Sequence, residues 1–287
     1  MVRGNGKTAY YPGCSLNSSA REMGESFLEL VQGFGLEMSP LQDWSCCGSS
    51  PAHSTHHGRA LNLAARNLLL AEAQGIEELM VMCPSCFVRL KEAERQICSD
   101  PAKASQVKRC LGKSYRGSVR LRFFLEVMDC WGLEALRDKV RIPLNGLRGA
   151  LYYGCLLSRP EWITGFDVGP YEGFLEGLFR ALGGEPVRWG LGKQCCGAHL
   201  AVSKPGLADH LVDRIRDQAR RAGAHCLVVF CPLCQVNLEL RGRHSGKLPV
   251  LYITEVLGIA TQSPNVRSWM GRHLVDPRSL LASIAGT

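Results

Sequence analysis

The same arrangement of cysteine-containing segments occurs twice in this chain of 287 residues. AYYPGCSL at 9–16 matches LYYGCLL at 151–157, and SCCGSSPAH matches QCCGAHLAV. ELMVMCPSCFVRL at 78–90 likewise matches CLVVFCPLCQVNL at 226–238, in the same order along the chain. Because matching cysteines are separated by 141 to 149 residues, the sequence indicates a duplicated unit of about half the chain.

Each half also alternates short apolar segments with amphipathic ones, which favours strands alternating with helices. The expected strands are TAYYPG, ELMVMC, GALYYG and CLVVFC. The expected helices cover 19–35, the stretch before Gly75 and the stretch after Pro84, then 174–182 and 207–222. Ser19 and Glu22 predict a capping box for the first helix. Such alternation favours an α/β fold: two similar, pseudo-symmetric repeats, each a small, mainly parallel sheet with flanking helices.

The repeat leaves the middle of the chain without a counterpart. We expect a first domain over 1–110, a connecting helical segment over 111–148 and a second domain over 149–287. In both domains the cysteines follow directly after expected strands. They therefore lie on the loops at the edge where parallel sheets carry their sites.

Composition narrows the class of function. With 46% hydrophobic and 21% charged residues and no run of 18 apolar residues, the chain is typical of a globular protein without a membrane span. The N-terminal segment lacks the apolar core of a signal peptide, so we expect a cytoplasmic location. A net charge of +8 suits an anionic substrate or an acidic electron-transfer partner, whereas scattered basic residues do not favour nucleic acid. Fourteen cysteines in a chain too long to need disulfides favour metal or redox chemistry.

Each repeat contains five matching cysteines. A Cys-x-x-Cys motif at a strand-to-helix junction, as at Cys83 and Cys86, is shared by thioredoxin-like dithiols, zinc sites and iron–sulfur sites. A dithiol needs two sulfurs, whereas structural zinc and a cubane [4Fe–4S] cluster take four. Two alternatives remain: a four-ligand site with a spare reactive thiol, or a cluster of unusual shape that uses all five. The adjacent Cys46 and Cys47 favour the second, because they reach two irons more easily than one, and Gly48 allows close backbone approach.

These segments resemble those of a known family. YYPGCSL, DWSCCG, FFLE, YYGCLLSRP, CCGAHL and CPLCQVNL are similar to the tandem cysteine-rich CCG domains of HdrB, the catalytic subunit of heterodisulfide reductase, from Tyr10 to about Gly258. In that family each set of five cysteines holds a noncubane [4Fe–4S] cluster. The resemblance therefore implies two such clusters here, with the ligands Cys14, Cys46, Cys47, Cys83, Cys86, Cys155, Cys195, Cys196, Cys231 and Cys234.

The resemblance also implies a function. A small disulfide would lie between the two clusters and be cleaved by electrons that arrive one at a time, or be formed in the reverse direction. Such an oxidoreductase acts on sulfur groups within a complex, with a ferredoxin-like HdrC-type subunit and a flavin-containing HdrA-type subunit. An alternative is a CCG electron-transfer subunit of a respiratory dehydrogenase or sulfur-oxidation complex that cleaves no disulfide. A substrate-sized gap between the clusters favours the first hypothesis and a closed contact the second; a zinc-stabilised binding module is a third.

A few residues beside the cysteines complete the candidate site. His53 and His199 follow the double cysteines and are candidate proton donors to a leaving thiolate. Arg159 and Lys193 lie near second-repeat cysteines, where they would bind an anionic substrate group or offset the negative charge of a thiolate-ligated cluster. The remaining cysteines are expected to be ordinary thiols: Cys98, Cys110, Cys130 and Cys226.

Overall fold

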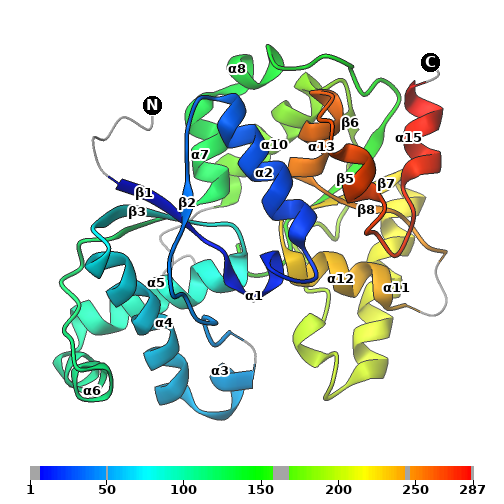
Figure 1. The fold of residues 1–287 in the computed structure, drawn as a ribbon. Helices are drawn as coiled ribbons and strands as arrows, with labels where there is room; N and C mark the ends of the chain where they lie inside the picture. Colours follow the sequence, from blue (N-terminus) through cyan, green and yellow to red (C-terminus); the bar gives the residue numbers. More distant parts are fainter. Residues whose placement is uncertain (1–6, 50, 158–167, 243–245, 286–287) are drawn as a thin grey trace.

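The computed structural model describes residues 7–49, 51–157, 168–242 and 246–285 and shows two α/β halves (Figure 1). Each half is built on a four-stranded sheet in which every strand pairing is parallel. The predicted α/β class and the two similar repeats are therefore confirmed. In the described ranges, no helix is both long enough and apolar enough to cross a membrane.

The two sheets have the same strand order. The first sheet runs β2-β1-β3-β4, with β1 (Lys7–Tyr11), β2 (Ser39–Pro40), β3 (Ile76–Val81) and β4 (Arg120–Phe123). The second runs β6-β5-β7-β8, with β5 (Arg148–Tyr152), β6 (Glu185–Pro186), β7 (Cys226–Val229) and β8 (Val250–Tyr252). Strand β7 is buried along its whole length, as expected for a parallel strand covered on both faces. Parallel pairing places the carboxyl ends of all strands at one edge of each sheet.

Helices follow the strands in both halves. Those of the first half are α1 (Gly13–Leu16), α2 (Arg21–Gly33), α3 (Pro51–Thr55), α4 (His57–Ala73), α5 (Pro84–Ser99), α6 (Pro101–Leu111), α7 (Phe124–Trp131) and α8 (Leu133–Arg137). Those of the second are α10 (Val168–Ala181), the short 3₁₀ helix η1 (Ala198–Leu200), α11 (Pro205–Arg221), α12 (Pro232–Leu240), α13 (Ile253–Ala260), α14 (Val266–Met270) and α15 (Arg278–Ala285). As predicted, Pro84 opens α5, because proline suits the first helical position. Gly183 and Gly223 follow the ends of α10 and α11 with φ of +89° and +79°.

The start of α2 differs from the prediction. A capping box is expected at Ser19 and Glu22, but α2 begins at Arg21 with Ala20 as its N-cap and no side-chain capping bond. The amide of Ala20 instead donates to the carbonyl of Ser15 at 2.9 Å, within the turn that follows α1. Glu22 makes no capping bond and lies buried, with 4% of its surface exposed.

The predicted connecting segment 111–148 contributes a strand to the first sheet. Strand β4 lies within it and pairs with β3. β4 leads into α7 as β8 leads into α13, and in both places the last strand amide donates to a glutamate three residues on. These bonds run from Phe123 to Glu126 at 2.7 Å and from Tyr252 to Glu255 at 2.9 Å. The repeat thus extends to a fourth strand and its helix, while the domain boundaries at 110 and 148 stay a prediction.

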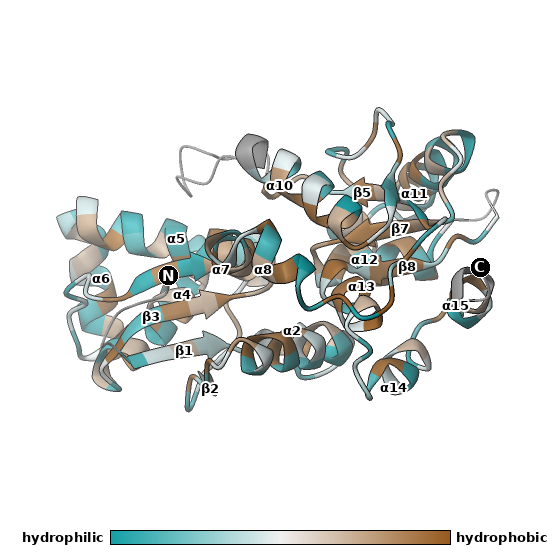
Figure 2. Ribbon diagram, turned by 90° about the horizontal axis from the view of Figure 1, so that it is seen from above, coloured by the Kyte–Doolittle hydropathy of each residue, from teal (hydrophilic) through white to brown (hydrophobic). Residues whose placement is uncertain are grey.

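Each half also packs one of its helices on the other half, an arrangement that we call the helix exchange. α2, the first long helix of the first half, packs on α13 of the second, and α10 packs on α7 and α8 of the first (Figure 2). A buried hydrogen bond of 2.8 Å joins Ser26 of α2 to Thr254 of α13. Because α2 and α10 hold equivalent places in the repeat, the exchange is reciprocal. Each half therefore completes its core with an element of the other.

Candidate functional site

All ten cysteines predicted as ligands lie after the carboxyl ends of the strands, in loops or first helical turns. In the first half, Cys14 lies in α1 after β1, Cys46 and Cys47 lie in the loop after β2, and Cys83 and Cys86 open α5 after β3. The second half repeats this placement after β5, β6 and β7. Electrostatic interactions among the thiols of each half show that the fold gathers each set of five into one group. We call these the first and the second cysteine group.

A tyrosine from the first strand of each half holds the double-cysteine loop. The Tyr11 hydroxyl donates to the carbonyl of Ser45 at 2.6 Å, and the Tyr152 hydroxyl donates to the carbonyl of Gln194. Each acceptor directly precedes a double cysteine. The same bond therefore fixes the start of both loops.

The glycine after each double cysteine is required by the backbone. Gly48 and Gly197 have φ of +76° and +79°, in the left-handed region that favours glycine. A Cβ atom would lie 3.3 Å from a helix Cα atom at Gly48 and 3.2 Å at Gly197, so both glycines allow a close approach to the following helix. In this conformation the two glycine amides donate to Cys46 Sγ at 3.4 Å and to Cys195 Sγ at 3.3 Å.

Sulfur atoms within each group lie close together. Cys47 Sγ is 3.3 Å from Cys86 Sγ, and the equivalent atoms of Cys196 and Cys234 are 3.6 Å apart. Among the residues that the structure describes, no three His, Cys, Asp or Glu side chains are grouped so as to hold a single metal ion. In both halves this sulfur pair joins the second cysteine of the double motif to the second of Cys-x-x-Cys.

Neighbouring thiols make protonation uneven within each group. Hydrogen bonds from Cys46 and then from Cys86 lower the pKa of Cys47 to about 5. In the second group, the hydrogen bond from Cys155 lowers the pKa of Cys195 to about 5. Both groups therefore hold thiolate at neutral pH, which is the form of cysteine that binds metal and attacks disulfides.

The two groups meet at one point. Cys83 and Cys231, the N-caps of α5 and α12, are each 5% exposed. A hydrogen bond between these two side chains, and then one from Cys86, holds the pKa of Cys83 well below its usual range. Because both helix N-termini favour negative charge, the contact is a buried thiolate-bearing bridge between the groups.

A pocket of about 330 Å³ opens between the two halves. All five cysteines of the second group line it, and the first half contributes His53, Arg89 and the start of α5. Among the described residues, no cysteine of the first group lines it. The pocket is large enough for a small molecule. A molecule bound in the pocket would therefore contact cysteines of the second group alone.

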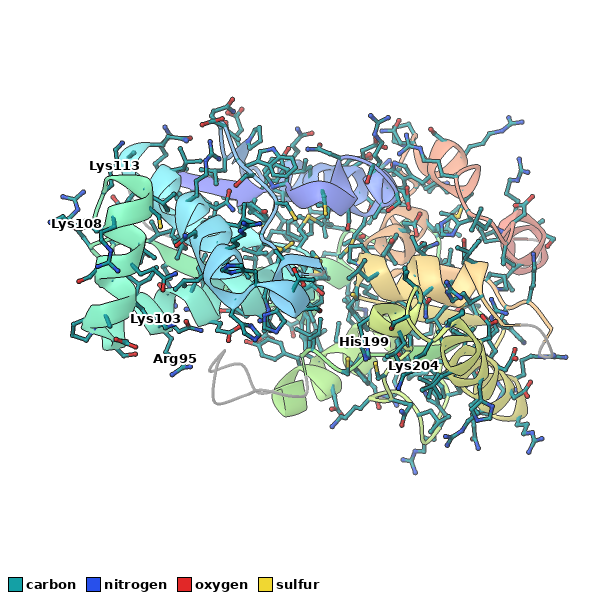
Figure 3. The ribbon with its side chains drawn as sticks, turned by 90° about the horizontal axis from the view of Figure 1, so that it is seen from below. Arg95, Lys103, Lys108, Lys113, His199 and Lys204 are labelled. Carbon is teal, nitrogen blue, oxygen red and sulfur yellow. The ribbon has the colours of Figure 1, made fainter. Side chains whose placement is uncertain are left out.

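Both predicted histidines face this pocket, from opposite halves. Arg89 Nη1 lies 2.8 Å from His53 Nδ1 and 2.5 Å from the Glu92 carboxylate. Burial, and then the charge of Arg89, lower the pKa of His53. His199, labelled in Figure 3, places its Nδ1 3.8 Å from Cys195 Sγ. Arg89 was not predicted from the sequence, although it lies one helical turn after Cys86 and so shares the face of that ligand.

The other predicted site residues lie away from the pocket or outside the described residues. Lys193 does not line the pocket, and its ammonium group pairs with the Glu172 carboxylate. Arg159 lies outside the described residues. Cys226 is buried within β7, where burial raises the pKa of its thiol to about 12. Three further thiols outside the groups are exposed: Cys98, Cys110 and Cys130.

Basic side chains gather far from the pocket. Arg95 and the lysines labelled at α6 and after it lie at one end of the molecule in Figure 3, whereas His199 lies nearer its middle. These lysines are Lys103, Lys108 and Lys113. Part of the net charge of +8 is therefore carried at a surface remote from the second cysteine group.

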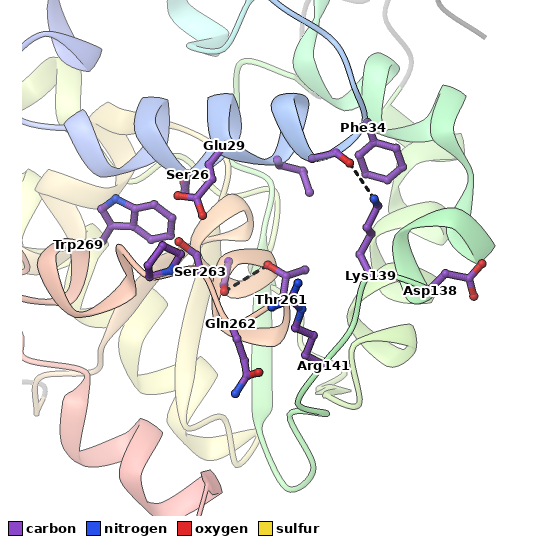
Figure 4. Close-up of a pocket in the computed structure, with 14 residues that line it drawn as sticks. Ser26, Glu29, Phe34, Asp138, Lys139, Arg141, Thr261, Gln262, Ser263 and Trp269 are labelled. Carbon is purple, nitrogen blue, oxygen red and sulfur yellow. Dashed lines mark hydrogen bonds between the residues drawn. The ribbon is translucent and has the colours of Figure 1, made fainter.

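A larger cavity of about 480 Å³ lies between α2, the end of α13 and the segment after α8 (Figure 4). Its described lining includes no cysteine or histidine. Lys139 crosses one side of it and donates to the carbonyl of Gly33 at 2.7 Å. We therefore assign the candidate site to the smaller pocket, which the thiols line.

The chain matches the family model described as "Cysteine-rich domain" (CCG) over residues 8–91 and again over 150–239. The chain belongs to the CCG cysteine-rich domain family. Among curated relatives, it is 30% identical over 282 residues to the 8-methylmenaquinol:fumarate reductase membrane anchor subunit of Wolinella succinogenes, covering 95% of this chain and 98% of the relative. It is 28% identical to a protein of Archaeoglobus profundus named as similar to the B subunit of heterodisulfide reductase, covering 88% and 90% of the two chains. The resemblance found in the sequence is thus confirmed.

Two further likenesses concern this CCG chain as a whole. It is 21% identical to lactate utilization protein A of an Exiguobacterium species, covering 87% of this chain and 96% of the relative. A solved structure of a hypothetical protein from Helicobacter pylori matches with a TM-score of 0.73 at 15% identity. That match covers 95% of this chain but 52% of the other, so the CCG chain spans about half of it and the likeness shows the fold alone.

Proposed function

We propose that this chain is the catalytic iron–sulfur subunit of a heterodisulfide reductase-like complex, in which a small disulfide is reduced, or formed, in the pocket between the halves. The observation that carries this proposal is the pocket itself, which has room for a small molecule and is lined by all five second-group cysteines. The HdrB-like relative from Archaeoglobus profundus supports the same function. The reaction would be an oxidation or reduction of sulfur groups.

The donor set supports iron–sulfur clusters, and we propose two of the noncubane [4Fe–4S] type. Five thiols per group exceed the four that zinc or a cubane cluster binds. The adjacent cysteines bond with each other and also have different partners, because Cys47 pairs with Cys86 whereas Cys46 bonds with Cys14. The proposed ligands are the ten cysteines of the two groups. Clusters bound there would supply one-electron chemistry and iron atoms that hold sulfur.

The chain's own residues would bind and orient the substrate. Glu92 holds the Arg89 guanidinium beside His53 at the first-half wall of the pocket, where guanidinium can bind a carboxylate, sulfonate or phosphate. His199 lies beside Cys195 and is placed to give a proton to a leaving thiolate, with His53 as a second proton donor. The substrate class proposed here is therefore a small anionic thiol or its disulfide. Arg159 stays a prediction for the same anionic group, whereas Lys193 would serve only to offset charge.

We propose that the chain works as one subunit of a complex in the cytoplasm. Its net charge of +8 suits an acidic electron donor, for which we propose a ferredoxin-like HdrC-type subunit. A flavin-containing HdrA-type subunit would pass electrons to that donor. The buried contact of Cys83 with Cys231 would connect the two groups within the chain.

That same contact favours a second candidate function. A closed bridge between the groups suits a CCG electron-transfer subunit that relays electrons and cuts no disulfide. Relatives named as a fumarate reductase subunit and as a lactate utilization protein support this candidate. The two functions differ in whether the pocket of about 330 Å³ binds a thiol.

The deciding experiment is to purify the chain without oxygen and to measure iron, sulfide and zinc per chain together with the EPR spectrum. About eight irons follow from two four-iron clusters. A panel of small thiols, with carboxylate, sulfonate or no charge, is then added to the oxidised protein. A spectrum that changes with an anionic thiol supports disulfide chemistry. Full iron with a spectrum unaffected by every thiol supports the relay, and zinc without iron overturns both in favour of a zinc-stabilised binding module.

A further inference from the structure

Three ionisable side chains form a fully buried, hydrogen-bonded set behind the second cysteine group. His273 Nδ1 lies 2.9 Å from the Glu239 carboxylate, and its Nε2 lies 3.0 Å from the Glu255 carboxylate. None of the three side chains is more than 1% exposed. The second oxygens of the carboxylates accept the amides of Leu274 and Tyr252 at 2.8 and 2.9 Å. An imidazole that faces a carboxylate with each nitrogen carries a proton on both, so His273 is a cation between two anions.

Glu22 adds a third buried carboxyl at the same place. It lies in the first turn of α2, the helix that packs on α13. Burial and, among the charges, that of Glu255 raise its pKa to about 7. The charges that face it are Glu255 of α13, His273 and Arg272 of the loop after α14, and beyond Glu255 the phenol of Tyr252 at the end of β8. We call Glu22, Glu239, Glu255 and His273 the buried acid group.

The other charges around this group are already paired. Arg216 of α11 is flanked by Asp213 and by the group's own Glu239. Arg272 pairs with Glu25 at 2.8 Å. With Arg216 counted beside His273, three carboxyls of the group still face only two cations, so one carboxyl lacks a counter-charge. Because a buried site disfavours uncompensated negative charge, the α2 carboxyl is the member that exchanges its proton near neutral pH.

Helix α12 connects the buried acid group to the second cysteine group. It begins directly after Cys231, and its Gln235 lies 3.4 Å from His273 Nδ1. The hydroxyl of Tyr252 is buried and has no hydrogen-bond partner among the described residues. After burial itself, Glu22, Glu255 and then Cys231 raise the pKa of this phenol, so Tyr252 lies within electrostatic range of both groups. In such a dry interior, charge gained at the cysteines is poorly screened from the carboxyls.

The first half lacks an equivalent among its described residues. Glu126 occupies the place of Glu255 and accepts the Phe123 amide in the same way. Its side chain is 21% exposed and lies 3.8 Å from the Arg122 guanidinium, so its charge is compensated at the surface. The buried acid group is therefore a feature of the second half, beside the cysteines that line the pocket.

We propose that the buried acid group is a proton-binding site that takes up one proton when iron held by the second cysteine group is reduced by one electron. The proposal rests on the iron–sulfur chemistry proposed above, with a one-electron donor protein as the reductant. For each electron received, one proton leaves bulk water and converts the Glu22 carboxylate to a carboxylic acid. No covalent bond besides the new O–H is made. The proton offsets the added negative charge and makes reduction easier.

The test is a redox titration of the complete, iron-loaded chain at several pH values, followed by EPR. The wild-type midpoint potential of the second group should fall as pH rises above about 7, by at most about 59 mV for each tenfold change in proton concentration. In Glu22→Gln, the neutral amide stands in for the protonated acid, so the potential should stay high and lose this dependence. Infrared difference spectra between oxidised and reduced protein should show a carboxylic acid band that is absent from the variant.

Controls separate this proposal from the function on which it rests. Glu29→Gln removes the same charge two turns along α2, where the carboxylate bonds with Asn265 at the surface, and should keep the wild-type slope. Glu22→Asp keeps a carboxyl on a shorter side chain, so its midpoint potential should depend on pH more than that of Glu22→Gln and less than that of the wild type. A Glu22→Gln protein with full iron and an unchanged slope overturns the proton site and leaves the proposed function standing. A wild-type chain without iron overturns the proposed function itself, and the infrared band then has no redox change to follow.

Discussion

The two cysteine groups have the same supports and different surroundings. In both, a strand tyrosine holds the double-cysteine loop, a left-handed glycine follows it, and a proline-opened helix presents Cys-x-x-Cys. In the first group, Cys14 and Cys46 are exposed, whereas in the second Cys155 and Cys195 are half-buried and line the pocket. Duplication thus preserved what positions the sulfurs. What changed is the surface that each group faces; under the proposed function, electrons would enter at the first group and substrate would bind at the second.

The largest expected effect comes from removing one buried ligand in each group. Cys47→Ser and Cys196→Ser should each lose the iron of their own half, about half of the total, because the groups touch only at Cys83 and Cys231 among the described cysteines. Iron analysis and EPR measure this directly. Of the two, Cys196→Ser should also abolish any response to thiols. Loss of all iron from either variant would show that the groups assemble as one unit.

Replacing one large buried side chain in each exchanged helix by alanine should have the next largest effect. Phe27 of α2 and Phe179 of α10 are both fully buried, and Phe→Ala changes at such positions cost about 3–5 kcal/mol. Denaturant unfolding should therefore show lower stability in Phe27→Ala and Phe179→Ala, each with one cooperative transition. Two separate transitions, with only one half affected, would contradict the interlocked arrangement.

The buried acid group predicts a pH dependence of stability that the first half does not share. Burial alone would lower the pKa of His273, but hydrogen bonds to Glu239 and Glu255 raise it to about 10. A raised pKa means that the stabilisation is complete below the unfolded value of about 6.5 and is lost as pH rises through about 10. Thermal unfolding between these limits should show falling stability, by a few kcal/mol. The slope should be much smaller in His273→Gln, and an equal slope in that variant would exclude His273 as the cause.

A smaller effect, on binding, should separate Arg89, which lines the pocket, from the predicted Lys193, which does not. Arg89→Gln should raise the KM or Kd for an anionic thiol by about tenfold, near 1.4 kcal/mol, because the pocket loses its guanidinium. Lys193→Gln removes the same charge outside the pocket, where it pairs with Glu172, and should leave that affinity unchanged. Titration of the EPR signal with carboxylated and uncharged thiols measures both. Equal weakening for the uncharged thiol would assign Arg89 to packing.

The smallest expected effect is also the one that should be equal in the two halves. Tyr11→Phe and Tyr152→Phe each remove one hydrogen bond to a double-cysteine loop, at a cost of about 1 kcal/mol. Urea midpoints and iron content measured side by side would test this equivalence. A loss of iron in one variant alone would mean that the two loops depend on their tyrosines to different degrees.

The sequence predicted the parts of the fold that depend on local pattern. Buried strands, proline-opened helices and glycine ends are all encoded within a few residues, so β3, α5 and the end of α11 were predictable. The repeat itself predicted two matching cysteine groups. The fourth strand of the repeat was not predicted, because β4 and β8 share little beyond an aromatic residue followed three positions later by glutamate.

The surroundings of the site were less predictable, because they depend on contacts between distant residues. Arg89 belongs to the first half but lines a pocket of second-half cysteines, and nothing local indicates that crossing. Glu22 matched a capping pattern and proved to be a buried carboxyl, since α2 continues from the turn after α1 and packs on a helix more than two hundred residues away. The roles of His53, His199 and the ten cysteines stay predictions, which the iron, EPR and thiol measurements test.

The helix exchange also determines when, during synthesis of the chain, α2 can be buried. Helix α2 leaves the ribosome early, yet the partner that buries it, α13, ends at Ala260. A nascent chain therefore exposes the side of α2 that faces α13 until residue 260 has emerged, although Phe27 can already pack on Phe124 of α7. The contact between the two halves is completed only after the last strand of the second sheet, since β8 ends at Tyr252 and α13 follows it.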